Sequence, residues 1–316
     1  MIRRPPRSTL SSSSAASDVY KRQEETKMIW ETVIQPFVDF GFMRRALLGC
    51  VAISLGATPI GVFLMLRRIS LTGCAMASAV LPGAATGYLI FGLSLVPMTF
   101  GGLGAGLAVA LLSGFVTRRT QLREDSSLAA FSLIALALGV LIVSMRGNNM
   151  DLMRVLFGMV LALDDTTLIL LCSITSFSVL TLALLLRPLV LECVDPQFLR
   201  SVSKLSAFTH FTFLVLVVLN LVGGFHALGT LMAVGIMLLP ATAGRFWTNG
   251  ISSLIIVAII FAMLSSFTGL LLSYHYNLPS GPAIILVNSM VYVMSFMFGP
   301  VGGIVNQVFF HRQVKV

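Results

Sequence analysis

The sequence predicts an all-α fold, a polytopic membrane helix bundle of about nine transmembrane helices. Of the 316 residues, 57% are hydrophobic and only 10% are Asp, Glu, Lys or Arg, whereas about 25% of a typical soluble domain is charged. The mean hydropathy is +0.95, and the apolar residues gather in long blocks separated by short polar breaks. So few charges cannot cover a water-facing surface, which excludes a soluble globular protein and a disordered one.

The first 23 residues differ in character from the rest of the chain. They are polar and of low complexity, and five basic residues against Asp18 supply +4 of the net charge of +9. They hold no apolar stretch, so they do not form a secretory signal. The string MIRRPPRSTLSSSSAASDVYKRQ resembles translated sequencing-adapter read-through, with a disordered native tail as the alternative. We therefore expect residues 1–27 to be non-native or disordered, with a native start at Met28 or Met43.

A short amphipathic helix is expected at residues 28–45, ahead of a transmembrane domain at 46–303. The short helix carries Trp30, Phe37 and Phe40. Aromatic residues on an amphipathic helix are typical of an anchor that lies in the membrane interface.

Nine apolar segments approach the length of about 20 residues that a spanning helix needs. They lie at roughly 46–66, 74–94, 96–117, 127–145, 168–186, 207–223, 227–244, 251–273 and 282–299. A further apolar segment, Asp151–Leu163, is too short to span and is either re-entrant or interfacial. The sequence therefore allows eight to ten spans.

The distribution of Lys and Arg predicts the orientation through the positive-inside rule. If the first span runs inward, the cytoplasmic breaks and a cytoplasmic tail at 304–316 hold eleven basic residues, which are Arg67, Arg68, Arg118, Arg119, Arg123, Arg187, Arg200, Lys204, Arg245, Arg312 and Lys315. The outer breaks hold Arg44, Arg45, Arg146 and Arg154. We therefore expect the N-terminus outside, the C-terminus inside and an odd number of spans. Basic charge spread over loops in this way does not form a patch that would bind nucleic acid.

Small residues and prolines inside the apolar segments indicate a helix bundle around a pathway. Gly102 and Gly106 form a GxxxG pair, which lets helices approach closely. Pro59, Pro82 and Pro240 interrupt apolar blocks, and such breaks persist where a neighbour or a cavity satisfies the freed carbonyl. Ordinary packing glycines and kinks are the alternative. The four cysteines are dispersed, so neither a disulfide framework nor a CxxC metal motif follows.

The sequence lacks the common motifs of hydrolytic and nucleotide-binding enzymes. It contains no Walker A sequence, GxSxG elbow, HExxH or GxGxxG, and only four histidines. We therefore expect no catalytic residues and no ATPase activity from the chain alone.

Five stretches resemble one family, in order and at family spacing. The stretch LRRISLTGCAMASAVLPG at 66–83 resembles the pattern RRMSL-x-GDA-x-x-HA-x-LPG. The others are EDSSL at 124–128, DLMRVLFG at 151–158 followed by Asp164 and Asp165, the segments ALGTLM and LPATA within 227–243, and YHYNLPSGPAI at 274–284. Over about Arg44 to Gly303, the chain thus resembles the permeases of the zinc/manganese/iron class of ABC importers.

The chain departs from this family in the motif that pairs an Asp with a His. The family has an Asp and a His four residues apart on one helical face, which resembles a gate or a transient metal ligand pair in the permeation path. Here Cys74 stands at the Asp position and Ser78 at the His position. A thiolate is a softer ligand than a carboxylate and favours Zn²⁺ over Mn²⁺. The alternative is that both residues only pack and that the metal step lies elsewhere or has been lost.

Further candidates for the metal pathway lie at predicted outer ends of spans. Asp151, Asp164 and Asp165 could attract cations or dock an acceptor protein; the alternative is solvated loop charge or a helix N-cap. His226 and His275 could pass a metal inward, because imidazole is a common neutral ligand. A structural role at a helix end is the alternative for both histidines.

The predicted cytoplasmic loop at 191–203 mixes charged residues with apolar ones. It resembles the family's coupling helix, which docks into the ATPase, and an amphipathic helix in a groove needs apolar anchors framed by polar residues. The candidate coupling residues are Glu192, Asp195, Pro196, Phe198 and Leu199. Leu199 stands where the family has Ala, and a plain connecting loop is the alternative.

The resemblance implies a permease subunit of an ABC importer that carries a divalent transition metal across the bacterial cytoplasmic membrane, with zinc first and manganese second. It implies a permease homodimer in membrane lipid, separate ABC ATPase subunits, and an extracytoplasmic metal-binding protein. No cofactor would be bound stably, and the metal is the substrate. A permease for a metal chelate, such as a siderophore or cobalamin, and an ion-coupled secondary transporter are the alternatives.

Overall fold

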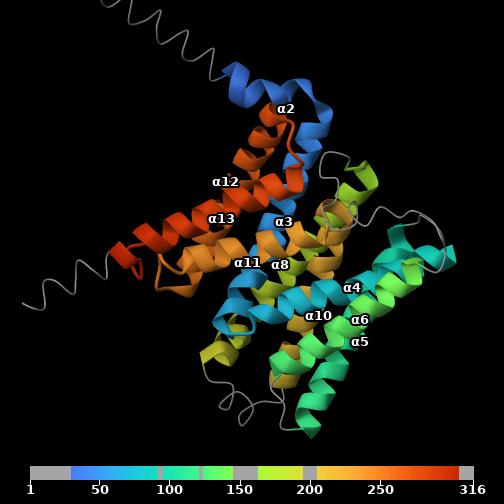
Figure 1. Ribbon diagram of the computed structural model, residues 1–316. Helices are drawn as coiled ribbons and strands as arrows, with labels where there is room; N and C mark the ends of the chain where they lie inside the picture. The colour runs from blue at the N-terminus through green and yellow to red at the C-terminus, as the bar shows by residue number, and fades with distance from the viewer. Residues whose placement is uncertain (1–29, 92–94, 121–123, 145–162, 195–204, 306–316) are drawn as a thin grey trace, which may run out of the picture. The chain divides into compact units, whose positions relative to one another are not determined.

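The structure is a computed structural model that describes residues 30–91, 95–120, 124–144, 163–194 and 205–305. Throughout these residues every regular element is helical (Figure 1). The predicted all-α fold is confirmed. The chain divides into two compact units, residues 1–44 and residues 45–316.

The first unit holds two short helical elements and the start of a long helix. The π-helical turn η1 (Trp30–Ile34) leads into α2 (Gln35–Asp39). Phe40 then adopts an extended conformation, and α3 begins at Gly41. The region predicted as one interfacial helix is therefore divided at Phe40, and its last residues belong to α3. Its place in the membrane interface stays a prediction.

Nine long helices build the rest of the described chain. They are α3 (Gly41–Leu66), α4 (Ser70–Phe91), α5 (Leu95–Arg119), α6 (Glu124–Ser144), α8 (Asp165–Val194), α10 (Leu205–Leu228), α11 (Thr230–Gly244), α12 (Ile251–Tyr276) and α13 (Ser280–Phe298). Seven helices among the described residues are long and apolar enough to cross a membrane, and the apolar stretches Ser126–Ile142 and Thr230–Gly244 are shorter. Each of the nine predicted segments thus corresponds to one helix.

Three helix ends differ from their predicted positions by five residues or more. α3 begins five residues before the predicted 46. α8 continues past Pro188 to Val194, where the sequence suggested an end near 186. The break between α10 and α11 lies at Gly229, where φ is 86°, because glycine alone enters that region without steric cost. Prolines and glycines inside apolar blocks therefore mark breaks less reliably than they do in water-soluble helices.

The helices of the second unit contact one another in two groups. α4, α5 and α6 contact each other, as do α11, α12 and α13 (Figure 1). α10 contacts members of both groups as well as α8. This places α10 at the junction of the bundle.

Glycines allow several of these helices to meet backbone to backbone. A Cβ atom added at Gly83 of α4 would lie 2.1 Å from the Gly101 carbonyl oxygen of α5. The predicted GxxxG pair of α5 meets side chains instead: a Cβ at Gly106 would lie 2.6 Å from Val218 of α10, and one at Gly102 would lie 3.0 Å from Val80 of α4. The close approach expected from GxxxG is confirmed.

A side chain of α3 satisfies the carbonyl that Pro240 frees in α11. Proline cannot donate to the carbonyl four residues earlier, which is that of Ile236. The Thr58 hydroxyl donates to this oxygen at 3.2 Å. One turn further along α3, a Cβ at Gly61 would lie 1.8 Å from the Met237 carbonyl oxygen. α3 and α11 are therefore joined through backbone contact and a buried hydrogen bond.

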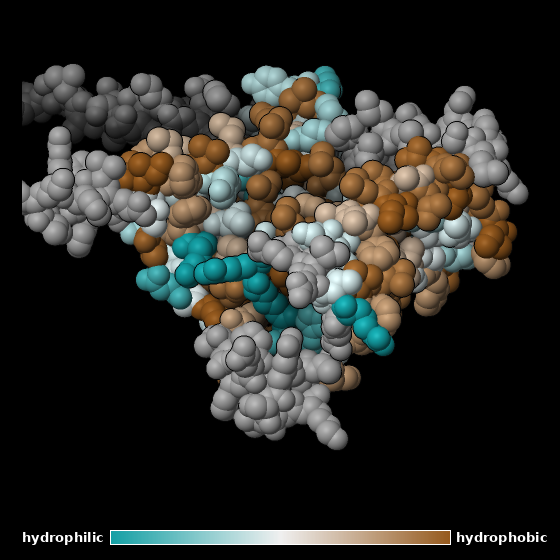
Figure 2. All heavy atoms as spheres, turned by 60° about the horizontal axis from the view of Figure 1, so that its bottom comes forward, coloured by the Kyte–Doolittle hydropathy of each residue, from teal (hydrophilic) through white to brown (hydrophobic). Residues whose placement is uncertain are grey.

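The outside of the molecule is largely apolar. Large aliphatic residues are strongly exposed: Leu184 is 75%, Ile90 is 73% and Ile169 is 69% exposed. Among the residues that Figure 2 colours, apolar ones cover most of the visible face, and hydrophilic ones gather in a smaller area. Such a surface suits contact with lipid rather than with water.

Candidate metal pathway and coupling site

Cys74 and Ser78 lie one turn apart on the same side of α4. The Cys74 side chain is exposed and Ser78 is half-buried, so the described chain does not cover this part of the helix. The Ser78 hydroxyl donates to the Cys74 carbonyl oxygen at 3.2 Å. Pro82 follows four residues later and has no N–H to donate to the Ser78 carbonyl. One face of α4 therefore presents a thiol, a hydroxyl and a backbone carbonyl relieved of its helical partner.

Asp164 caps the start of α8. Its side-chain oxygens accept from the Asp165 backbone N–H at 2.9 Å and from the Thr166 hydroxyl at 2.9 Å. Its own carbonyl accepts from the Leu168 N–H at 3.0 Å. Asp164 therefore occupies the N-cap position, which was the alternative interpretation of this residue, although its side chain bonds the Asp165 N–H and the Thr166 hydroxyl rather than the N2 or N3 N–H of a standard cap. Asp164 is exposed.

Asp165 forms an exposed ion pair with Arg45 of α3. The Arg45 Nε lies 2.8 Å from one carboxylate oxygen, and Nη2 donates to the other at 3.1 Å. The pair joins the first turn of α8 to the start of the predicted first span. Because it is exposed, it contributes little to stability, but it fixes which helix ends are neighbours.

The two histidines of the predicted pathway lie in different surroundings. His226 is in the last turn of α10, where its Nε2 is buried without a hydrogen-bond partner and its ring packs edge-on against Phe225 at 5.3 Å. His275 is exposed at the end of α12, with its ring centroid 5.4 Å from that of Tyr274. Within the described residues, no three His, Cys, Asp or Glu side chains come together as a metal site. A pathway through this chain would therefore use ligands in succession rather than one closed cage.

Glu192, predicted as a coupling residue, is buried in an ion pair. It lies on α8, inside the stretch predicted as loop, and accepts from Arg67 Nη2 at 2.6 Å. The side chains of Arg67 and Glu192 are 8% and 9% exposed. The His210 Nδ1 of α10 lies 3.3 Å from Arg67 Nη1 and 3.6 Å from the second Glu192 oxygen. The other predicted coupling residues, Asp195, Pro196, Phe198 and Leu199, lie outside the described residues, as does Asp151 of the pathway.

The two ion pairs show that α3 and α8 run parallel. Arg45 and Asp165 join the two helices near their starts, and Arg67 and Glu192 join them near their ends. Parallel first and fifth spans are what the predicted topology requires. Which end faces the cytoplasm stays a prediction from the distribution of Lys and Arg.

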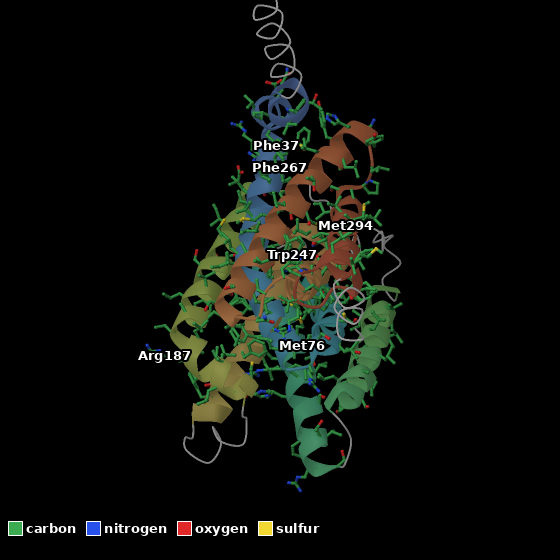
Figure 3. The ribbon with its side chains drawn as sticks, turned by 90° about the vertical axis from the view of Figure 1, so that its left-hand side faces the viewer. Phe37, Met76, Arg187, Trp247, Phe267 and Met294 are labelled. Atoms are coloured by element: carbon green, nitrogen blue, oxygen red, sulfur yellow. The ribbon has the colours of Figure 1, made fainter. Side chains whose placement is uncertain are left out.

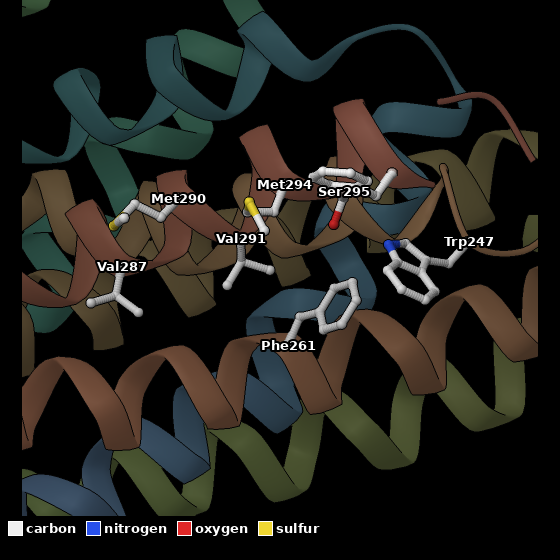
Figure 4. Close-up of a pocket in the computed structure, with 8 residues that line it drawn as sticks. Trp247, Phe261, Val287, Met290, Val291, Met294 and Ser295 are labelled. Atoms are coloured by element: carbon white, nitrogen blue, oxygen red, sulfur yellow. The ribbon is translucent and has the colours of Figure 1, made fainter. Parts of the chain in front are cut away.

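An apolar pocket of about 390 Å³ opens between α12 and α13 (Figure 4). Trp247, Phe261, Met290 and Met294 contribute to its lining, and the Ser295 hydroxyl and the Trp247 indole N–H are the polar side-chain groups among its lining residues. Its lining contains no carboxylate or imidazole, which are the side chains that bind Mn²⁺ or Zn²⁺. The pocket therefore does not belong to a metal pathway.

Comparison with known proteins identifies the family. Residues 39–299 match the ABC 3 transport family. The chain belongs to the ABC 3 transport family. The family match and the seven candidate spans of the described residues indicate that the chain is a multi-pass protein of the bacterial cytoplasmic membrane. The predicted family and localisation are confirmed.

Individual relatives cover nearly the whole of this ABC 3 chain. It is 30% identical to the manganese transport system membrane protein MntC of Halalkalibacterium halodurans, over 88% of this chain and 94% of that protein. Its structure resembles PsaBC from Streptococcus pneumoniae with a TM-score of 0.78 and 26% identity, over 89% of this chain and 98% of that one. An inward-facing transporter assigned to the metal-chelate ABC type has a TM-score of 0.65 and 14% identity, over 79% and 84% of the two chains. At that identity the likeness extends to the fold alone.

The Arg67, Glu192 and His210 cluster has no local signal in the sequence of this ABC 3 chain. Its members are separated by 125 and 143 residues. The sequence indicates only that isolated charged residues stand at the ends of apolar blocks. A charged side chain that is buried there needs an oppositely charged or hydrogen-bonding partner. Without the fold, the partners of these charges could not be chosen.

Proposed function

We propose that the chain is the permease subunit of an ABC importer for a divalent transition metal, with manganese as the first substrate and zinc as the second. The observation that carries this proposal is the likeness to MntC over 88% of the chain, strengthened by the likeness to PsaBC. The relatives' names favour manganese, which reverses the order that the Cys74 thiol suggested. The residues of the chain must therefore be compatible with a harder ion than zinc.

The α4 face offers oxygen atoms that suit manganese. Mn²⁺ prefers carboxylate, carbonyl and water ligands. Ser78 supplies a hydroxyl oxygen. Its backbone carbonyl oxygen receives no helical hydrogen bond, because the residue four positions later is Pro82, which has no N–H. Discontinuities in membrane helices are a common source of carbonyl ligands for transported cations. We infer that Cys74 and Ser78 lie on the pathway and replace part of the ion's water shell for a short time.

The outer ends of the spans complete the proposed pathway. Asp164 and Asp165 place exposed carboxylates beside each other at the start of α8, where they attract cations or meet a positively charged partner. His226 and His275 stand at the ends of α10 and α12 and offer imidazoles to an entering ion. No side chain is proposed to retain a metal or another cofactor stably.

The partners follow from the family. Two copies of the permease form one pathway, separate ATPase subunits bind on the cytoplasmic side, and an extracytoplasmic binding protein delivers the metal. The residues predicted to couple to the ATPase are Glu192, Asp195, Pro196, Phe198 and Leu199. Residues 28–45 are proposed to lie at the membrane interface, ahead of a permease domain at 46–303. Movement of the ATPases then opens the pathway to one side at a time.

The alternatives have weaker support. A metal-chelate permease is favoured only by a likeness of fold at 14% identity. An ion-coupled secondary transporter uses ionisable groups within its spans. Among the described residues, each Asp and Glu lies at an end of a long helix or outside one.

Manganese uptake by the assembled transporter tests the proposed function. The permease, its ATPase subunits and its binding protein are reconstituted in liposomes, and uptake of radioactive Mn²⁺ is followed with ATP inside or outside. We expect uptake that requires both ATP and the binding protein, is inhibited by Zn²⁺ and is indifferent to a proton or sodium gradient. An ATPase subunit with an inactivated catalytic site is the control. Uptake of an intact metal chelate only, or uptake driven by an ion gradient without ATP, would contradict the proposal.

The purified permease alone should not hydrolyse ATP. The sequence contains no Walker A motif, so the chain has no loop to cradle the nucleotide phosphates. Phosphate release is measured with the permease alone, with the ATPase subunits alone and with the complete assembly. Activity that purifies with the permease after the ATPase subunits have been removed would overturn the subunit assignment.

A further inference from the structure

We propose that Arg67 is a positioning residue for coupling, which ties α3 to α8 and α10 at the two helix ends that flank residues 195–204. The proposal rests on the proposed function in one respect, namely that the ATPase subunits act on this chain from the side where these helix ends lie. The cluster of Arg67, Glu192, His210 and Phe213 is called the arginine clamp below.

The end of α3 directs Arg67 into the bundle. The Ile69 N–H donates to the Leu64 carbonyl at 3.1 Å, and the Arg68 N–H donates to the Met65 carbonyl at 3.0 Å. Arg68 has φ of 59°, so this is a Schellman ending with Arg68 in the left-handed position. The chain therefore turns sharply after Arg67, and the exposed Arg68 side chain is separated from the buried one beside it.

Three contacts of the clamp involve the Arg67 guanidinium, and His210 Nδ1 also lies 3.6 Å from a Glu192 oxygen. The guanidinium donates to Glu192 at 2.6 Å and to His210 at 3.3 Å, and its centre stands 4.5 Å from the Phe213 ring centroid. A guanidinium can only donate, so His210 Nδ1 is assigned as the acceptor in the neutral imidazole. One side chain of α3 thus contacts α8 once and α10 twice.

The contacts fall at the two helix ends that flank residues 195–204. Glu192 lies in the last turn of α8, which ends at Val194. His210 lies in the second turn of α10, which begins at Leu205. A force applied between these two helices therefore acts on both partners of Arg67 at once.

α3 has a direct connection from the clamp to the other half of the bundle. Roughly two turns before Arg67, the Thr58 hydroxyl donates to the Ile236 carbonyl and Gly61 meets the Met237 carbonyl of α11. Because a helix is stiff along its axis, a displacement of α3 at Arg67 reaches α11 at these contacts. The clamp is thus placed to make α3, α8 and α10 move together and to pass that movement on to α11.

The chemistry of the clamp suits positioning better than stability. A buried ion pair often stabilises a fold no more than apolar residues of similar volume, but it permits few arrangements. Charge-assisted hydrogen bonds also have a narrow range of length and direction. An apolar contact at this point would let α3 slide, whereas the ion pair holds it in one register.

Spin labels on the two helix ends test the clamp without reference to the metal. Labels are placed at Arg68→Cys, after α3, and Arg187→Cys, on an exposed side of α8 that points away from the bundle (Figure 3). The background has its four native cysteines replaced by alanine. In the complete transporter, the distance between the labels should be the same with and without ATP and vanadate. In the variant R67M/E192L, which keeps bulk but removes both charges, the distance should change or its distribution broaden on nucleotide binding.

Transport efficiency provides the second measurement. In the otherwise wild-type chain, R67M/E192L should lower the number of Mn²⁺ ions imported per ATP hydrolysed by about tenfold, which lies within the usual range of coupling between sites. ATP hydrolysis and assembly with the ATPase subunits should persist. The variant R187Q removes a positive charge from the exposed side of α8 and is the matched control. The thermal unfolding temperature of each variant separates lost folding from lost coupling.

The outcomes are distinguishable. An unchanged label distance and an unchanged ratio of metal to ATP in folded R67M/E192L would overturn the clamp. If R67M/E192L does not fold, R67K/E192D is measured in its place; it keeps both charges and should couple only in part, because a Lys cannot make the forked contact. Failure of the wild-type transporter to import Mn²⁺ would refute the proposed function, while the label distances would still decide the clamp.

Discussion

The substitution Gly61→Ala should unfold or disassemble the bundle at the contact between α3 and α11. The new Cβ would lie 1.8 Å from the Met237 carbonyl oxygen and 2.7 Å from its carbon. Both are backbone atoms of a helix, so they cannot move aside as a flexible side chain would. Overpacking a tight core costs about 1–3 kcal/mol and occasionally more, and we expect this position to lie at or above the upper end of that range.

Gly104→Ala is the matched control for Gly61→Ala. A Cβ at Gly104 of α5 would meet no atom within 4 Å. Because Ala favours a helix over Gly by about 1 kcal/mol, this substitution should leave stability unchanged or raise it slightly. Thermal unfolding in detergent and the monodisperse fraction on size-exclusion chromatography measure both variants. Equal stability of the two would mean that direct backbone contact does not set the spacing of α3 and α11.

Loss of the hydrogen bond from Thr58 to the Ile236 carbonyl should lower stability less than Gly61→Ala does. Thr58→Val leaves the Ile236 carbonyl without its donor, and hydrogen bonds between membrane helices are worth on average about 0.6 kcal/mol and at most about 1.7 kcal/mol. The same unfolding measurement places Thr58→Val between the two glycine variants. The reverse order would mean that Pro240 is accommodated in some other way.

Much of the fold could be predicted because the bilayer imposes a simple rule. A spanning segment must satisfy its own backbone hydrogen bonds, so each apolar block becomes a helix. The ends were less predictable. α8 continues through Pro188, and α10 continues past Gly223 and Gly224 to the left-handed Gly229. Gly224 is retained for packing, because a Cβ there would lie 2.5 Å from the Ala233 side chain. Whether a glycine breaks a helix or packs it depends on its neighbours in space.

The candidate site was predictable only where its residues are close in sequence. Cys74 and Ser78 are four residues apart, so the helical period alone places them on one face, and the hydrogen bond between them agrees. The capping role of Asp164 was likewise a local alternative. The sequence singles out Arg67 only as a basic residue of a cytoplasmic break and Glu192 only as a candidate coupling residue. Their pairing across 125 residues depends on how α3 and α8 pack.

Restoring the family pair with Cys74→Asp and Ser78→His should tighten the interaction with manganese. The double variant puts a carboxylate and an imidazole on one face of α4, in place of a thiol and a hydroxyl that is bonded to the backbone. Carboxylate oxygen suits Mn²⁺ better than sulfur does. Changes in the surroundings of metal ligands alter affinity by about 10–100-fold, so we expect the KM for Mn²⁺ to fall by about tenfold. The maximal rate should not rise in proportion, because an ion held more tightly also leaves more slowly.

Zinc separates the contribution of Cys74 from that of Ser78. If the thiol lines the pathway, Cys74→Ala should weaken inhibition of Mn²⁺ uptake by Zn²⁺ about tenfold, because sulfur is the ligand that favours zinc. Manganese uptake itself should change less, since the Ser78 oxygens remain. Leu71→Ala is the control, because Leu71 is 67% exposed near Cys74 on α4 and has no ligand atom in its side chain. Unchanged KM in the double variant together with unchanged zinc inhibition in Cys74→Ala would mean that this face of α4 only packs. A change in zinc inhibition alone would assign the thiol to the pathway and leave the manganese ligands to the backbone and to water.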